Sequence, residues 1–155
     1  MSHYGGMNWQ ANLVVGHSGI LEVARESKRV AVLGIKTEAH AGAAAFYVAE
    51  YLVEAGVDVV PVPVYFPEVT EILGRRVYRR LVDVPQPIDL VNVFRRSKDV
   101  PAHVDDIIAA HPRAVWLQLG IRNDEAAERL ARAGILVVQD RCLMVDHRIA
   151  VRTSG

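Results

Sequence analysis

The sequence predicts an α/β fold, a doubly wound parallel sheet of five strands with helices on both faces. Short apolar runs of strand length alternate along the chain with stretches of helical periodicity. The runs are apolar throughout, which indicates strands buried on both faces, and the single helices between them indicate right-handed parallel crossovers. With 155 residues and 51% apolar content, the chain is large enough for one such domain with its own core.

The first half of the chain supplies a helix, a strand and a second helix. Ser18 is placed to cap a short helix that runs to Ser27, and the first strand follows over residues 29–34. The second helix begins near Gly42 and ends at Gly56. Its apolar residues recur at helical spacing, namely Ala45, Val48, Ala49 and Leu52.

Prolines restrict the second strand. A proline in a central parallel strand removes a hydrogen-bond donor, so we expect pairing over 57–60 only, with Pro61 and Pro63 beyond the paired part. Residues 65–87 show no clear period, apart from a turn indicated at Gly74 and short helical pieces.

The second half supplies three strands and two helices. The strands are expected over 89–94, 114–120 and 135–140. Pro101 begins the first helix and Pro112 ends it, whereas Asn123 caps the second, which ends at Gly134. Two charge pairs at i,i+4 spacing support this last helix, Glu125–Arg129 and Glu128–Arg132. We expect an N-terminal extension over 1–17, one domain over 18–150 and a C-terminal tail over 151–155.

Composition excludes several classes of protein. The 18 basic and 18 acidic residues leave no net charge, so we expect neither a nucleic-acid partner nor an anionic membrane surface. The single cysteine, Cys142, excludes an internal disulfide and a cysteine-rich zinc site, and it indicates a reducing compartment, the cytoplasm. The first ten residues do not resemble a secretory signal, and no apolar run approaches the about 20 residues that span a bilayer.

The loop after the first strand is the first candidate for ligand binding. Ligands of doubly wound sheets lie beyond the carboxyl ends of the strands, where the winding direction switches. We expect the loop from Gly34 to Gly42 to face the loop after Gly120, and the amino end of the following helix suits a phosphate. The G-x-G-x-x-G fingerprint, an acidic end to the second strand and the P-loop pattern are absent, which argues against ordinary NAD recognition and against a nucleoside triphosphatase. A packing role for Gly34 stays open.

Three motifs closely resemble those of the small stand-alone CoA-binding protein family. They read "DLVNVFRRSKDVP", "AVWLQLGIRNDEAAERLARAGI" and "VVQDRCLMVDH". That family is related to the CoA-binding domain of the succinyl-CoA synthetase α subunit. The resemblance covers roughly residues 20–147 and implies a Rossmann-like, nucleotide-binding fold that holds coenzyme A, free or acylated, at the carboxyl edge of the strands.

The resemblance also implies which residues contact coenzyme A. It puts the diphosphate near Gly34, Ile35, Lys36 and Thr37, the adenine-ribose end near Val62, Pro63, Phe94 and Arg95, and the pantetheine arm toward Leu119 and Gly120. A missing acidic residue on the second strand fits this ligand, because a carboxylate would repel the 3′-phosphate and a guanidinium binds it bidentately. The first loop departs from the family, which usually carries Ser and Pro after the strand glycine, and Thr37 is the candidate to replace the serine hydroxyl.

Other reactive residues have simpler interpretations. Cys142 and His147, near Asp140 and Asp146, invite a nucleophile or metal interpretation, but we expect a buried thiol and a surface histidine. We expect His40 to be an exposed loop residue. Core packing is expected for the aromatic residues Trp116 and Phe94, and a solvated face, with CoA or nucleic-acid contact as the lesser alternative, for Arg75, Arg76, Arg79 and Arg80.

The resemblance favours a coenzyme A binding module without its own catalysis. In the related synthetases, ligation needs a phosphorylated histidine on a further domain and a nucleotide-grasp subunit, and this chain has room for neither. Two alternatives stay open. One is a CoA-dependent enzyme, related to acyl-CoA ligases or acting as a thiol transferase, and the other is a CoA or redox sensor that uses Cys142. The sequence leaves a homodimer open as well.

Overall fold

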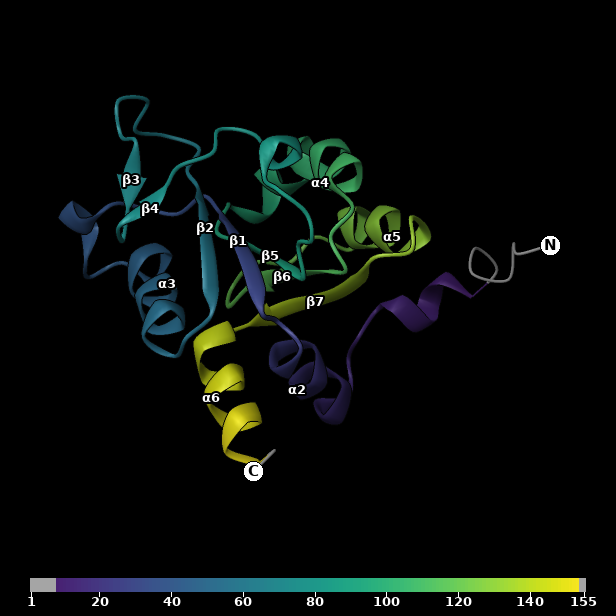
Figure 1. Cartoon of the computed structure of the whole chain (residues 1–155). Helices are drawn as coiled ribbons and strands as arrows, with labels where there is room; N and C mark the ends of the chain where they lie inside the picture. The colour runs from purple at the N-terminus through teal and green to yellow at the C-terminus, as the bar shows by residue number, and fades with distance from the viewer. Residues whose placement is uncertain (1–7, 154–155) are drawn as a thin grey trace.

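The computed structural model describes residues 8–153 and contains the expected sheet (Figure 1). Five parallel strands lie side by side in the order β2-β1-β5-β6-β7. Their bounds are β1 Arg29–Leu33, β2 Asp58–Val62, β5 Leu90–Val93, β6 Ala114–Gln118 and β7 Leu136–Arg141. The prediction of a doubly wound, Rossmann-like five-stranded sheet is confirmed.

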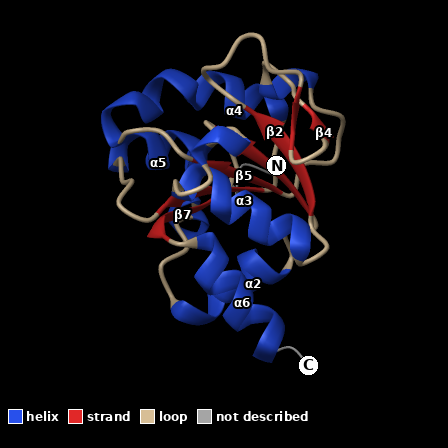
Figure 2. Cartoon of the chain, turned by 90° about the vertical axis from the view of Figure 1, so that its left-hand side faces the viewer, coloured by secondary structure: helices blue, strands red, loops and turns tan. Residues whose placement is uncertain are grey.

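Helices cover both faces of this sheet (Figure 2). One face carries α2 (His17–Arg25), α3 (Ala44–Glu54) and α6 (Leu143–Thr153), and the other carries α4 (Val104–Ala110) and α5 (Asp124–Arg132). Alternate strand residues enter the two cores. In β1, Val30 and Val32 pack on the first face, whereas Ala31 and Leu33 pack on the second. Double-sided burial therefore explains why this strand is apolar throughout.

The ends of the chain carry more structure than the sequence indicates. A 3₁₀ turn, η1 (Trp9–Asn12), precedes α2, and Leu13 forms a parallel bridge with Val137 on the outer edge of β7. No helix was expected after residue 140, yet α6 runs to Thr153 and so includes residues 151–153 of the expected tail. Residues 1–7 of the expected extension and 154–155 of the tail lie outside the described residues.

The prolines do not end the second strand where the sequence predicted. Strand β2 continues to Val62, and Pro61 pairs in register with Val32. The prediction assumed a central strand, but β2 is at the edge of the sheet. The nitrogen of Pro61 therefore faces away from β1 and needs no partner there, while its carbonyl accepts a hydrogen bond from the Tyr78 amide at 2.9 Å.

The region that lacked a clear period forms a hairpin and a 3₁₀ turn. Strands β3 (Glu71–Ile72) and β4 (Arg75–Arg76) pair antiparallel, and η3 spans Leu81–Asp83. The turn expected at Gly74 is confirmed: Leu73 and Gly74 both have positive φ, 54° and 71°, as a two-residue type I′ turn requires. This region replaces a crossover helix between β2 and β5.

Three expected helix details differ from the structure and two are confirmed. Helix α2 begins at His17 with Gly16 as its N-cap, so Ser18 is not the cap. Pro101 lies inside the 3₁₀ segment η4 (Ser97–His103), and α4 begins only at Val104.

Asn123 does cap α5, because its side chain accepts a hydrogen bond from the Ala126 amide at 2.9 Å. The Glu128–Arg132 pair forms at 2.8 Å, but Arg129 pairs with Asp105 of α4 in place of Glu125. Here a contact between helices prevails over spacing within one helix.

Candidate functional site

The winding direction of the sheet switches between β1 and β5. The chain leaves β1 through α3 to reach β2 on one side, and later returns to β5 on the other side of β1. The loop after Gly34 therefore faces the loop after Phe94, and the expectation that it faces the loop after Gly120 is wrong. Strand β5 lies between β1 and β6 and separates those two loops. In a doubly wound sheet, this switch point is where ligands bind.

Gly34 is held at this point by both neighbouring strands. Its amide donates to the Val62 carbonyl at 2.9 Å, and the Phe94 amide donates to the Leu33 carbonyl at 2.9 Å. Its φ is +86°, and an added Cβ would collide with the Phe94 carbonyl oxygen. Only glycine fits both the conformation and the close approach of the two chains. The packing role that the sequence left open for Gly34 is therefore present.

The residues after Gly34 lead into the amino end of α3. Ile35 is buried and anchors the loop, and the Lys36 amide donates to the Ala45 carbonyl at 3.0 Å. The Thr37 hydroxyl lies 3.3 Å from Nδ1 of His40, which is exposed as expected. Helix α3 has 11 residues, and its amino end carries unpaired amides and the positive end of the helix dipole at the carboxyl edge of the sheet.

Arg95 is the cation that the structure brings to this loop. Its guanidinium lies 5.4 Å from the centre of the Tyr65 ring, and Nη1 donates to the Tyr65 hydroxyl at 3.3 Å. Nε donates to Nε2 of His103 at 3.2 Å, and Asp99 lies 4.0 Å away. The side chain is only 16% exposed. The next residue, Arg96, is 72% exposed and pairs with Asp99 at 2.8 Å.

The pKa values of three side chains near Arg95 are lowered, namely those of His103, Tyr65 and Asp99. Partial burial, and then the charge of Arg95, lowers the pKa of His103 and favours its neutral form, which can accept the Arg95 hydrogen bond. The hydrogen bond from Arg95 lowers the pKa of Tyr65. The hydrogen bond from Arg96 lowers the pKa of Asp99 and keeps this carboxylate charged.

Sequence reasoning missed Tyr65 and His103. Tyr65 lies in the stretch without a clear period, although its position two residues after Pro63 places it at the end of β2. His103 lies eight residues after Arg95 and reaches it only because η4 turns the chain back. A further ring contact joins His40 to Phe66, with the ring centres 5.2 Å apart.

The residues at the end of β2 are apolar. Val62 and Pro63 are both buried. The carboxylates closest in sequence to the site are engaged elsewhere: Glu38 accepts from the Leu73 amide at 2.8 Å, and Asp99 pairs with Arg96. Asp99 also lies 4.0 Å from Arg95, so part of the Arg95 charge is already balanced within the protein.

The last two expected contact residues lie apart from the others. Leu119 is 65% exposed, and Gly120 follows it in the loop after β6. Gly120 has a φ of +86°, and its amide donates to the Asp140 carboxylate at 2.7 Å. The structure thus brings together Gly34, Val62, Phe94 and Arg95, but it places Leu119 and Gly120 beyond β5.

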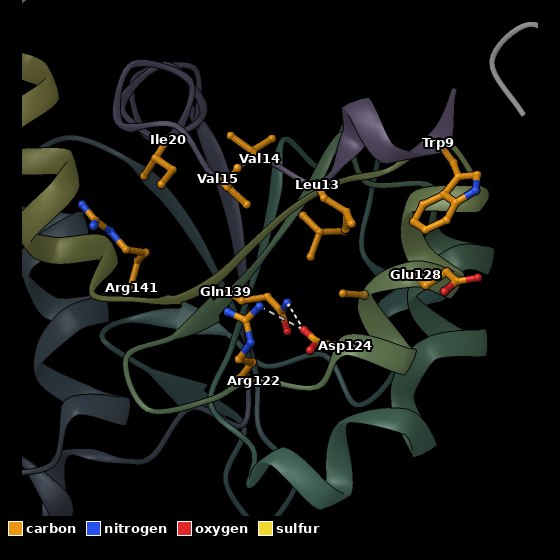
Figure 3. A pocket seen from close by; sticks show the side chains of 12 residues that line it. Trp9, Leu13, Val14, Val15, Ile20, Arg122, Asp124, Glu128, Gln139 and Arg141 are labelled. Atoms are coloured by element: carbon orange, nitrogen blue, oxygen red, sulfur yellow. Dashed lines mark hydrogen bonds and ion pairs between the residues drawn. The ribbon is translucent and has the colours of Figure 1, made fainter. Parts of the chain in front are cut away.

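A cavity of about 480 Å³ lies at the opposite edge of the sheet, along β7 (Figure 3). None of the ten expected coenzyme A contacts lines it. Its walls come from the segment before α2, from α5 and from β7. The lining side chains that Figure 3 labels are those of Trp9, Leu13, Val14, Val15, Ile20, Arg122, Asp124, Glu128, Gln139 and Arg141.

The structure also places the aromatic and reactive residues for which no ligand contact was expected. Trp116 is fully buried, as expected, and Cys142 is half-buried between β7 and α6. His147 is not a surface residue: it is only 5% exposed and shares a hydrogen bond with the Tyr51 hydroxyl at 2.8 Å. His147 lies on the buried side of α6, together with Leu143 and Ala150. Within residues 8–153, no three His, Cys, Asp or Glu side chains come together in a way that could hold a metal.

The four arginines of residues 75–80 are mostly occupied by contacts within the protein. Arg79 donates three hydrogen bonds to the carbonyls of Tyr65, Phe66 and Val69, at 3.2, 2.7 and 2.7 Å. Arg80 lies 3.6 Å from Asp106. This cluster stabilises the loop after β2.

The structure is that of a doubly wound α/β protein with the Arg95 side chain beside the Gly34 backbone at its switch point. The chain belongs to the CoA binding domain family, whose model matches residues 28–148. It is 32% identical over 130 residues to the uncharacterized protein YneT of Bacillus subtilis (strain 168), with 84% of this chain and 93% of YneT covered.

Two solved structures extend the comparison. The cell-free ID.343 structure from Thermus thermophilus is 36% identical, covers 88% of this chain and 99% of its own, and superposes with a TM-score of 0.78. The dinucleotide forming acetyl-coenzyme A synthetase 1 of Ca. Korarchaeum cryptofilum shares the fold at 20% identity and a TM-score of 0.62, over 76% of this chain and 27% of that synthetase.

Within residues 8–153, no helix is both long enough and apolar enough to cross a bilayer.

Proposed function

We propose that this protein binds coenzyme A at the switch point between β1 and β5. The observation that carries the proposal is the Arg95 guanidinium, which Tyr65 and His103 hold beside the Gly34 backbone. A largely buried guanidinium with a fixed orientation is suited to bidentate contact with a phosphate. Membership of the CoA binding domain family favours coenzyme A among phosphorylated ligands.

The residues present fit the parts of this ligand. The diphosphate would lie along the backbone from Gly34 to Thr37, at the amino end of α3, where helix amides and dipole favour an anion. The adenine-ribose end would lie between Val62, Pro63 and Phe94, with its 3′-phosphate at Arg95. A Cβ at position 34 would collide with the Phe94 carbonyl and would therefore disturb the backbone beside Arg95.

The pantetheine arm would cross β5 toward Leu119 and Gly120. Neighbouring strands lie about 4.8 Å apart, so this route covers roughly 10 Å from β1 to β6. We propose a binding module without catalysis, because the ring of His147, the candidate partner of Cys142, is bonded to the Tyr51 hydroxyl at 2.8 Å. The lone free cysteine supports a reducing, cytoplasmic setting.

Calorimetry with coenzyme A, dephospho-coenzyme A and NAD tests the proposal. We expect coenzyme A to bind most tightly, because only it carries the 3′-phosphate. Arg95→Met should remove most of its advantage over dephospho-coenzyme A, roughly tenfold or more for a lost charge-assisted contact. Arg96→Met is the matched control, since Arg96 is exposed and pairs only with Asp99 among the contacts described. Equal or absent binding of all three ligands would reject the proposal.

A further inference from the structure

The cavity along β7 is far larger than a solvent molecule and is not part of the site described above. Its apolar walls come from three places: the chain before α2, helix α5 and strand β7. The apolar side chains are those of Leu13, Val14, Val15, Ile20, Ala127 and Val137. We propose, on the basis of coenzyme A as the ligand, that this cavity receives the hydrocarbon acyl group of a CoA thioester.

The position of the cavity supports this assignment. The loop after β6 carries Gly120, at the expected end of the pantetheine arm, and two residues later it supplies Arg122 to the cavity wall. The Gly120 amide is bonded to Asp140, and the next residue, Arg141, lies on the same wall. A thioester sulfur near Gly120 therefore lies beside the mouth of the cavity.

The distance is compatible with the reach of the ligand. From β1 to β7 there are three strand spacings, roughly 14 Å in total. The pantetheine arm, with its two amide units, is comparable to about four extended residues, which span roughly 14 Å. The arm can thus reach the carboxyl ends of β6 and β7. An acyl group attached to the sulfur would then extend into the cavity along β7.

The charged groups of the cavity decide the class of acyl group. Arg122 pairs with Asp124 at 3.1 Å, and Gln139 donates to the same carboxylate at 3.0 Å. Arg141 makes a bidentate contact with the buried Asp146, at 2.9 and 2.7 Å.

The remaining carboxylate, Glu128, pairs with Arg132 at 2.8 Å. Because each of these charges already has a partner of opposite sign, an acyl group with a terminal carboxylate would gain little. A hydrocarbon chain would gain by displacing water from the apolar walls.

The volume suits a chain of medium length. A water-sized group occupies roughly 30 Å³, so an acyl chain of about eight carbons would fill about half of the cavity. Each fully buried methylene contributes about 0.8 kcal/mol, and partial burial of several should raise affinity roughly tenfold or more.

Calorimetry with CoA, acetyl-CoA and octanoyl-CoA tests this inference. We expect octanoyl-CoA to bind roughly tenfold or more tightly than CoA, with acetyl-CoA close to CoA. Leu13→Asp and Val15→Asp each place a charge on the apolar wall and should remove this difference while leaving CoA affinity unchanged. Val15 is 84% exposed, so that variant retains the fold, and thermal unfolding checks the Leu13 variant. The matched control is Val82→Asp, at a 37% exposed valine in η3.

Photocrosslinking gives a second readout that does not depend on affinity. A CoA thioester with a diazirine at the end of an eight-carbon acyl chain should label peptides from residues 9–20 or 122–141. Labelling confined to other peptides, or equal affinity of the wild-type protein for CoA and octanoyl-CoA, would overturn the inference and leave CoA binding intact. Loss of binding to every CoA compound would instead reject the proposed function.

Discussion

At the scale of single residues, the proposed site depends on two residues, one that has no side chain and one that has a large charged side chain. Gly34 contributes by having no side chain, because the Phe94 carbonyl occupies the space a Cβ would need. Arg95 contributes through a guanidinium whose orientation Tyr65 and His103 restrict. The first lets the Phe94 backbone approach β1 closely, and the second supplies a positive charge next to it.

Gly34→Ala tests the first of these roles. We expect the free energy of unfolding to fall by about 3 kcal/mol, since the alanine is strained at a φ of +86° and also meets the Phe94 backbone. Gly120→Ala is the control: its φ is also +86°, but nothing lies within 4 Å of an added Cβ, so about 1 kcal/mol is expected. Urea unfolding measures both, and equal losses would contradict the steric argument.

At the scale of elements, the loop after β2 depends on one arginine. Arg79 bridges three carbonyls of residues 65–69, and this segment carries the Tyr65 ring that contacts Arg95. The guanidinium thus satisfies backbone carbonyls of an irregular loop, as a neighbouring strand satisfies them in a sheet. Because the loop has no regular structure of its own, its shape depends on this contact.

Arg79→Met should loosen the loop without unfolding the domain. Three hydrogen bonds from an exposed guanidinium contribute about 1–2 kcal/mol locally, so amide exchange of residues 65–70 should become roughly tenfold faster. Arg76→Met is the matched control, since the Arg76 guanidinium lies over the Tyr78 ring and not over this loop. Hydrogen exchange measured by mass spectrometry would contradict the argument if both variants exchanged as the wild type does.

At the scale of the whole molecule, two histidines, the half-buried His103 and the buried His147, couple the fold to pH. Partial burial lowers the pKa of His103, with a further contribution from Arg95, and burial followed by the charge of Lys28 lowers the pKa of His147. In the unfolded chain both titrate near the ordinary value of about 6.5. Below that pH the unfolded state takes up protons that the folded state resists, so acid favours unfolding.

The free energy of unfolding should therefore fall as the pH drops from about 6.5 through the lowered values of these two histidines. His147→Gln should reduce this loss, because a glutamine does not titrate. His17→Gln, at an exposed position, should not. Urea unfolding at pH 7.5 and 5.5, with each variant compared with itself, measures the difference. An unchanged loss in His147→Gln would contradict the argument.

The parts of the fold that could be predicted are those with local causes. The five strands and the Asn123 cap follow from apolar runs and one side-chain hydrogen bond, both visible in neighbouring residues. Two errors share a cause. Pro61 was placed outside the paired part of its strand, and Arg129 was paired with Glu125, both without knowledge of the neighbouring element. The surroundings of Arg95 could not be found either, because Tyr65 is 30 residues away along the chain.

The sequence by itself determined the class of fold, the family and the identity of the residues at the strand ends, because hydrophobic period and motif order are local properties. Only the tertiary structure decided which strand ends are neighbours, since strand order depends on how the crossovers pack. That order places β5 next to β1 and so joins Gly34 to Phe94 and Arg95. It also leaves β7 at the edge, where the cavity opens.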